Sequence, residues 1–150
     1  MPTGVASDAM SREQIVSLFA ARDAAWAARD ARALGATHAR DGVVTSPTGG
    51  VLEGRDEIER IYQLWFSAFP DLLVQANDRL IDGNRAVEVA RLTGTHAGDF
   101  FGVPPTGRKV DVTVAFVMTI ENGEIVTERR VLDFTGVLVQ VGVIKARPHD

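Results

Sequence analysis

Two long extended segments joined by the dipeptide Asn122-Gly123 constrain this 150-residue chain more than any other feature. The run KVDVTVAFVMTI precedes the dipeptide, and EIVTERRVLDF follows it. Asn-Gly between two such segments is the strongest short-range signal for a hairpin, because both residues tolerate the positive φ of a tight turn. We therefore expect two long antiparallel strands in which Glu121 pairs with Glu124.

Helical patterns come first along the chain, and extended patterns follow. The capping-box motif SREQ at residues 11–14 predicts a helix start, and apolar residues then recur at helical spacing as far as Trp26. A second amphipathic helix, RDEIERIYQLWFSAF, is ended by Pro70. A short helical turn is expected between them, and the segments LLVQANDRLI and RAVEVARLTGT are expected strands. This order predicts an α+β fold with the helices on one face of a curved antiparallel sheet.

Length and composition are typical of one ordinary globular domain. We expect a flexible N-terminal tail over residues 1–11, a single domain over residues 12–144 and a C-terminal tail over residues 145–150. The formal net charge of −4 argues against nucleic acid or an anionic membrane as a partner. No window reaches the ~20 apolar residues of a membrane span, and no secretory signal is evident, so we expect a cytoplasmic protein.

The chain has no cysteine and only three histidines. Disulfides, thiolate chemistry and cysteine-based zinc sites are therefore excluded. His38, His96 and His149 are far apart in sequence and lack metal-binding spacing, so no dedicated transition-metal site is expected.

The strand at residues 110–118 is apolar at nearly every position. In an antiparallel sheet this indicates that both faces are covered. The helices or a pocket would cover one face, and we expect a second subunit on the other. The sequence thus predicts a homodimer or homotetramer assembled through the outer sheet face.

Asp133 is the one charged residue in the apolar segment VLDFTGVLVQVGVI. Counting back from the hairpin turn places Phe116 opposite Arg129, and Val112 opposite Asp133, on one apolar face. A β-bulge would exchange the two faces. On that face Asp133 could act as a general base. Alternatively, an acid before FTG caps a following helix without any chemistry.

Arg129 shares the predicted face with Asp133. Its guanidinium could hold a developing enolate, or it could pair with Asp133 or Glu128. Both interpretations stay open from the residues alone.

Three segments together resemble one known family. They are WFSAFPDL (residues 65–72), GTHAGDFFGVPPTGRKV (residues 94–110) and LDFTGVLVQVGVI. The resemblance is to the SnoaL-like polyketide cyclases, within the nuclear transport factor 2-like, ketosteroid-isomerase-like superfamily, and it covers residues 12–144. It implies a cone-shaped sheet wrapped with about three N-terminal helices around a pocket, the cystatin-like architecture.

The resemblance also implies an activity and a ligand. The family reaction is a cofactor-independent intramolecular aldol condensation, of lyase or isomerase type, that closes a ring of an aromatic polyketide. The implied ligand is a small hydrophobic polycyclic or polyketide-like molecule. The aspartate of the DxxG pattern, Asp133 here, would be the general acid/base.

Two departures from the family pattern alter polar groups expected to touch substrate. Where many relatives read FHDP, this chain has VTSP, which places Ser46 in the pocket. Where relatives often read EEW or EHW, this chain has TERR with Arg129. These differences leave the substrate open.

Several further residues are candidate ligand contacts or simple structural groups. His96 could donate a hydrogen bond at the pocket mouth or anchor the following loop, and the anchoring role is favoured. The loop with Phe100 and Phe101 could be a mobile flap over the pocket, or the two rings could be buried against a dimer partner, and this static form is favoured. Tyr62, Trp65 and Phe116 could pack in the core or touch an aromatic ligand.

Three classes of function follow from these patterns. The first is a cyclase that uses Asp133. The second is a cofactor-independent hydroxylase, isomerase or hydrolase in the same pocket. The third is a non-catalytic ligand-binding or assembly domain, since one fold serves many functions.

Overall fold

The computed structural model describes residues 4–146, with side chains from residue 12 onward. Its elements in chain order are α1 (Gly4–Ala28), α2 (Ala31–Ala36), β1 (His38–Ser46), β2 (Gly50–Glu53), α3 (Arg55–Ala68), β3 (Leu73–Asp82), β4 (Arg85–Thr95), β5 (Lys109–Glu121), β6 (Glu124–Leu132) and α4 (Phe134–Gln140). The predicted α+β class is confirmed. Three helices precede the long strands, as expected.

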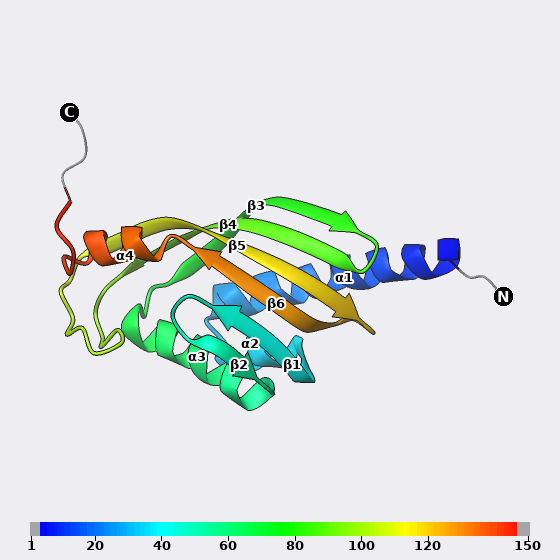
Figure 1. Cartoon of the computed structure of the whole chain (residues 1–150), viewed down its shortest axis with the longest axis horizontal. Helices are drawn as coiled ribbons and strands as arrows, with labels where there is room; N and C mark the ends of the chain where they lie inside the picture. The colour runs from blue at the N-terminus through cyan, green and yellow to red at the C-terminus, as the bar shows by residue number, and fades with distance from the viewer. Residues whose placement is uncertain (1–3, 147–150) are drawn as a thin grey trace.

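The six strands form one curved sheet in the order β2-β1-β6-β5-β4-β3. All neighbours are antiparallel except β1 and β6, which run parallel. The expectation of a wholly antiparallel sheet is therefore wrong at this pair. The sequence between β1 and β6 carries five other elements, so no hairpin fixes their relative direction. Figure 1 shows α1 behind the strands and α3 beside them, so that the helices and the inner sheet face enclose the core.

Helix α1 begins at Gly4, seven residues before the predicted start at Ser11. The capping-box motif therefore lies inside the helix. The residues VASDAM contain neither glycine nor proline, so nothing in them ends a helix that extends through the motif. Of the predicted tail, residues 1–3 lie outside the described residues, and residues 4–11 are helical.

Helix α3 follows the predicted pattern closely. It starts after Gly54, carries Asp56 and Glu57 in its first turn, where carboxylates favour the helix dipole, and ends before Pro70. Its buried residues are Ile58, Ile61, Tyr62, Trp65 and Ala68. This face closes the core against β1 and β2.

The predicted hairpin between β5 and β6 forms, and a bulge then changes its register. Glu121 pairs with Glu124 as expected, and Asn122 and Gly123 have φ of 52° and 75°. Ile120 still pairs with Ile125, but Thr119 pairs with Thr127, so one extra residue stands in β6. Such a bulge exchanges the two faces of the strand beyond it.

The exchanged register corrects the predicted pairing of Phe116 with Arg129. Phe116 lies opposite Arg130 instead, and Val114 lies opposite Leu132. Glu128, Arg130 and Leu132 therefore share the inner face with the buried residues of β5. Arg129 points to the outer face, where it is exposed.

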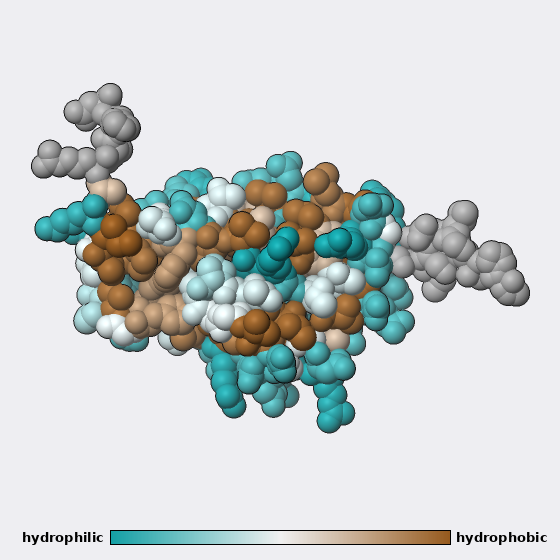
Figure 2. All heavy atoms as spheres, in the orientation of Figure 1, coloured by the Kyte–Doolittle hydropathy of each residue, from teal (hydrophilic) through white to brown (hydrophobic). Residues whose placement is uncertain are grey.

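The two faces of β5 differ more than its sequence suggested. Val112, Val114, Phe116, Met118 and Ile120 are buried, and the residues between them are exposed or half-buried. Within the single chain the outer face is open, and Figure 2 shows apolar and polar side chains interspersed on this side. No helix within residues 4–146 is long and apolar enough to cross a membrane.

Candidate functional site

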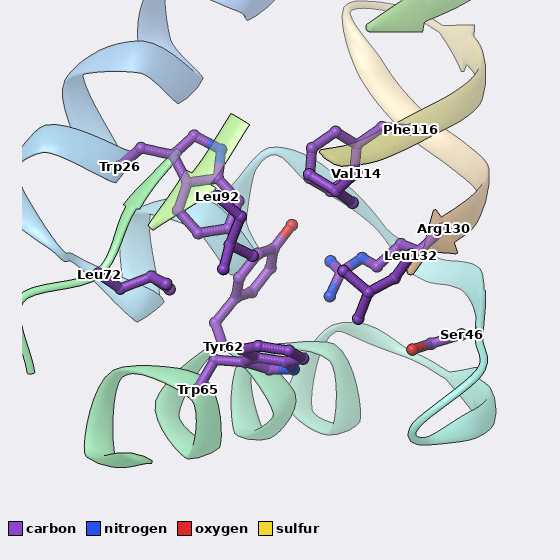
Figure 3. Close-up of a pocket in the computed structure, with 10 residues that line it drawn as sticks. All are labelled: Trp26, Ser46, Tyr62, Trp65, Leu72, Leu92, Val114, Phe116, Arg130 and Leu132. Atoms are coloured by element: carbon purple, nitrogen blue, oxygen red, sulfur yellow. The ribbon is translucent and has the colours of Figure 1, made fainter. Parts of the chain in front are cut away.

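A cavity lies between the inner sheet face and helices α1 and α3. It is lined by Trp26, Ser46, Tyr62, Trp65, Leu72, Leu92, Val114, Phe116, Arg130 and Leu132 (Figure 3). All of these except Ser46 and Arg130 present aromatic or aliphatic surface. The cavity is thus an apolar, partly enclosed chamber with few polar groups, the usual character of a small-molecule site.

The cavity is narrow in this structure. Its volume is about 30 Å³, which is room for about one or two water molecules. A ligand ring therefore enters only when lining side chains move, and a small planar ring needs less movement than a polycyclic one.

Arg130 is the one cation that lines the cavity, and its side chain is only 8% exposed. Its Nε donates a hydrogen bond of 2.6 Å to Glu128 Oε2, and its guanidinium lies 4.6 Å from the centre of the Tyr62 ring. Figure 3 shows the guanidinium directed to the middle of the lining residues, toward Tyr62. Its Nη2 is buried and has no hydrogen-bond partner among the described residues. The cavity thus contains a held cation with an unused donor.

A buried polar network supports this arginine from behind. Arg22, wholly buried on α1, donates from Nη1 to Thr37 Oγ1 at 2.9 Å and to the Tyr62 hydroxyl at 3.1 Å. The same hydroxyl lies 2.8 Å from His38 Nε2. Arg22 Nη2 stands 3.6 Å from Glu128 Oε1, close enough for an ion pair but too long for a hydrogen bond. The network therefore couples α1, α3, β1 and β6 beneath the cavity.

The charge states in the network follow from burial and from its neighbours. Burial lowers the pKa of His38 to about 3, against the attraction of Glu128, so the imidazole is neutral. Burial alone would raise the pKa of Glu128, but Arg130 and the other cations outweigh it and hold that pKa well below its usual range. Burial opposes the charge of Arg22 and Arg130, and their partners still raise both pKa values. Two cations thus face one carboxylate.

Acidification is expected to destabilise the folded chain through His38. The pKa of this group is 6.5 when it is unperturbed and about 3 in the fold. Between these values the unfolded chain binds more protons, so stability is full above pH 6.5 and falls as the pH falls. We expect a loss of about 2 kcal/mol between about pH 7.5 and about pH 5 from this group alone. Denaturant unfolding at both pH values measures it, and an equal loss in His38→Gln would contradict the assignment.

Four predicted site residues line the cavity: Ser46, Tyr62, Trp65 and Phe116. Ser46 reaches it from the end of β1, and its Oγ lies 3.0 Å from Thr48 Oγ1. Trp65 and Tyr62 come from successive turns of α3. The structure therefore brings these residues together, although their roles toward a ligand stay predictions.

Arg129 and Asp133 are not among the lining residues. Because of the bulge Arg129 faces outward, and Arg130, which the sequence reasoning missed, takes the inner position. Only a signal for a bulge after the hairpin turn could have shown this.

Asp133 is exposed and caps α4, since its Oδ1 accepts a 2.9 Å hydrogen bond from the Gly136 amide. The helix-cap alternative is thus confirmed. A Cβ on Gly136 would lie 2.3 Å from Asp133 Oδ2. The close approach of the cap explains the glycine of the DxxG pattern, whether or not Asp133 also takes part in chemistry.

His96 anchors its loop and does not line the cavity. It is wholly buried, and its Nδ1 lies 2.9 Å from Thr106 Oγ1. The loop is also fixed to the end of α3, where the Ala97 and Gly98 amides donate to Ala68. A Cβ on Gly98 would meet the Ser67 carbonyl oxygen at 2.1 Å. The anchoring role, favoured from sequence, is confirmed.

Phe100 of the same loop is wholly buried. Its ring contacts Trp65 and Phe69 edge-on, with centres 4.9 and 5.3 Å apart. The loop therefore closes one end of the core as a packed plug. Among the side chains of residues 12–146 no group of three His, Asp or Glu could hold a metal ion.

The comparisons with known proteins agree with this architecture. The model of the family described as SnoaL-like polyketide cyclase matches residues 17–141. A proposed SnoaL-like polyketide cyclase from Jannaschia sp. CCS1 is 28% identical, with a TM-score of 0.77 over 95% of this chain and 96% of that chain. IdmH, a proposed polyketide cyclase from Streptomyces antibioticus, is 26% identical, with a TM-score of 0.72 over 85% of this chain and 97% of that chain.

A third structure adds a likeness in fold alone. AclR, a proposed hydroxylase from Streptomyces galilaeus, is 24% identical, with a TM-score of 0.77 over 95% of this chain and 87% of that chain. A search of the curated proteins finds no match. Further solved neighbours have the nuclear transport factor 2-like and ketosteroid-isomerase-like folds. Because the family model matches nearly the whole domain, the chain belongs to the SnoaL-like polyketide cyclase family.

Proposed function

We propose that this protein closes a ring of a polyketide-type carbon acid by a cofactor-independent intramolecular aldol condensation. The observation that carries the proposal is the apolar cavity with a buried arginine whose Nη2 is unpaired. Such a chamber excludes water and presents a positive group where an enolate oxygen would develop. Membership of the family supports the same reaction class.

The proposed reaction moves one proton out and one proton back. A base removes a proton from a carbon between two carbonyl groups, and Arg130 stabilises the enolate oxygen. The enolate carbon attacks a second carbonyl of the same molecule, which forms the ring bond, and the resulting alkoxide takes up a proton. The cavity accelerates the reaction by holding the two reacting parts of the substrate in contact. The acid/base group typically raises the rate by 10²–10⁴-fold.

Glu128 on β6 and Asp133 just after this strand are the carboxylates next in sequence to the lining residues Arg130 and Leu132, and Asp133 is the better base. Glu128 is paired with Arg130 and Arg22, and its lowered pKa makes it a weak proton acceptor. Asp133 follows the lining residue Leu132 at the exit of β6. In the proposal its carboxylate turns from the Gly136 amide toward substrate and acts as the general acid/base.

A second candidate function, small-ligand binding without turnover, is favoured by two observations. The cavity is narrow, and the Asp133 carboxylate is already engaged as a helix cap. A ring-closure assay separates the two candidates, because a binding protein would hold the substrate and leave it unchanged.

Blocking the cavity is expected to abolish ring closure. The assay follows wild type with an open-chain aromatic polyketide intermediate, both as the free acid and as the methyl ester. Leu132→Trp fills the cavity from a half-buried position and should lower turnover at least about tenfold, because the space it fills is small. Val16→Trp, at an exposed position of α1, is the control and should turn over as wild type does. If wild type converts neither the free acid nor the methyl ester, the proposed reaction is refuted.

Assembly through the outer sheet face, as a homodimer or homotetramer, belongs to the same proposal. Val51, Leu80 and Val131 are exposed apolar residues of the strands, each more than half exposed. Size-exclusion chromatography tests it, and a monomer would refute it.

A further inference from the structure

We propose that the cavity selects a small planar ligand bearing a carboxylate or a comparable planar anion, which Arg130 binds, over the corresponding neutral ester. The proposal deepens the proposed function by naming the substrate class. Only its statement that the bound ligand undergoes ring closure rests on that function. Binding itself can be measured without turnover.

The first argument is the geometry of Arg130. Its Nε is committed to Glu128, and the Tyr62 ring supports its planar face, so the guanidinium has one fixed orientation. Nη2 is then the free donor of a buried cation that lines the cavity. A fixed planar guanidinium matches a planar carboxylate and makes a charge-assisted hydrogen bond with it.

The second argument is the charge balance behind the cavity. Arg22 and Arg130 both face Glu128, so two cations share this one carboxylate. Glu88 and Asp23 both bind Arg79, and Glu88 also attracts Arg22, so the wider set of three arginines and three carboxylates is balanced. Arg130 still has only a shared carboxylate as its partner, and an anionic ligand would give its Nη2 a charged acceptor. A neutral ester would offer only an uncharged one.

The third argument is the shape and chemistry of the remaining lining. Trp26, Tyr62, Trp65 and Phe116 surround the space with aromatic surface, which suits a flat ring. Trp26 Nε1 is also buried without a hydrogen-bond partner among the described residues, which leaves a second unused donor. Donors without acceptors favour a ligand rich in acceptor oxygens. Because the lining side chains must move to admit any ring, a small ring system requires the least rearrangement.

Benzoate and methyl benzoate are matched probes for this proposal. The chain has two tryptophans, Trp26 and Trp65, and both line the cavity, so their fluorescence reports binding directly. We expect saturable binding of benzoate to wild type at least about tenfold tighter than that of methyl benzoate, from the charge-assisted hydrogen bond. Arg130→Gln should lose at least about tenfold in benzoate affinity and change methyl benzoate affinity little. Arg129→Gln, the neighbouring arginine on the outer face, should bind benzoate as wild type does.

Arg130→Gln leaves Glu128 without its closest partner and could fail to fold. The double variant Glu128→Gln/Arg130→Gln removes both charges together and leaves a neutral amide at each position. It should show the same loss of benzoate affinity. Equal affinity of wild type for acid and ester, no saturable benzoate binding, or full benzoate affinity in a folded Arg130 variant would each overturn the proposal.

The binding experiment and the turnover experiment test different proposals, so either one can be refuted without the other. Selective benzoate binding without ring closure would refute only the proposed reaction. Ring closure with no preference for the acid would refute only the substrate class.

Discussion

Replacing Glu128 with alanine is expected to lower the free energy of unfolding by about 3–5 kcal/mol, the cost of leaving buried charges without their partner. The Glu128 side chain is wholly buried between two arginines, 2.6 Å from Arg130 Nε and 3.6 Å from Arg22 Nη2. Neither arginine can reach water without disrupting the core, since Arg22 is also fully buried. The two guanidinium groups would then repel each other in a region of low polarity. Denaturant unfolding followed by circular dichroism measures the loss.

The matched control is Glu124→Ala on the same strand. Glu124 pairs with Arg55 at 2.9 Å, but the two side chains are 45% and 39% exposed. An exposed pair of this kind contributes at most about 1 kcal/mol. Similar losses in the two variants would show that Glu128 does not neutralise the buried arginines, and the charge balance behind the cavity would need revision.

Local patterns predicted the elements of the fold well. The amphipathic stripe of α3, the stop at Pro70 and the Asn122-Gly123 turn each depend on neighbouring residues, and each is found as expected. The start of α1 was missed because the capping box was interpreted as a boundary, although no helix-breaking residue separates it from Gly4.

The orientation of the candidate site was harder to predict because it depends on one residue of register. The turn between Glu121 and Glu124 was correct, but the bulge after Ile125 moved Arg130 inward and Arg129 outward. The alternation of apolar residues does not show which of the two adjacent arginines faces inward. Tertiary contacts decide it, because Arg130 finds Glu128 and the Tyr62 ring on the inner face.

Sequence patterns did not predict the buried polar network, for a related reason. Arg22, His38 and Tyr62 come from three separate elements, and no local pattern indicates that they meet. On α1, Arg22 occupies a place on the apolar stripe, and only the fold shows that Thr37 and Tyr62 receive its hydrogen bonds. Polar residues on an apolar stripe are therefore better signals of a site than the signature motifs, whose glycines at residues 98 and 136 serve close packing.

The role of Asp133 can be separated from its capping role by two substitutions. Asparagine caps helices about as well as aspartate, because its side-chain oxygen accepts the same amide hydrogen bond. Asp133→Asn should therefore keep the stability of wild type, while ring closure falls about 10²–10⁴-fold, the usual contribution of a general acid/base. Asp133→Ala should show the same loss of turnover and an additional loss of about 1 kcal/mol in unfolding free energy, from the cap of α4.

The combination of outcomes distinguishes a base from a cap. Full turnover in Asp133→Asn together with a stability loss in Asp133→Ala would mean that the carboxylate only bonds the Gly136 amide, as it does in the structure. The base would then have to come from the cavity itself, where Tyr62 and Ser46 are the hydroxyl groups among the lining residues. Low turnover in a stable Asp133→Asn would instead require the carboxylate to leave its cap during reaction. In that case the capping hydrogen bond of α4 breaks during catalysis, because the Gly136 amide that Asp133 releases belongs to the first turn of that helix.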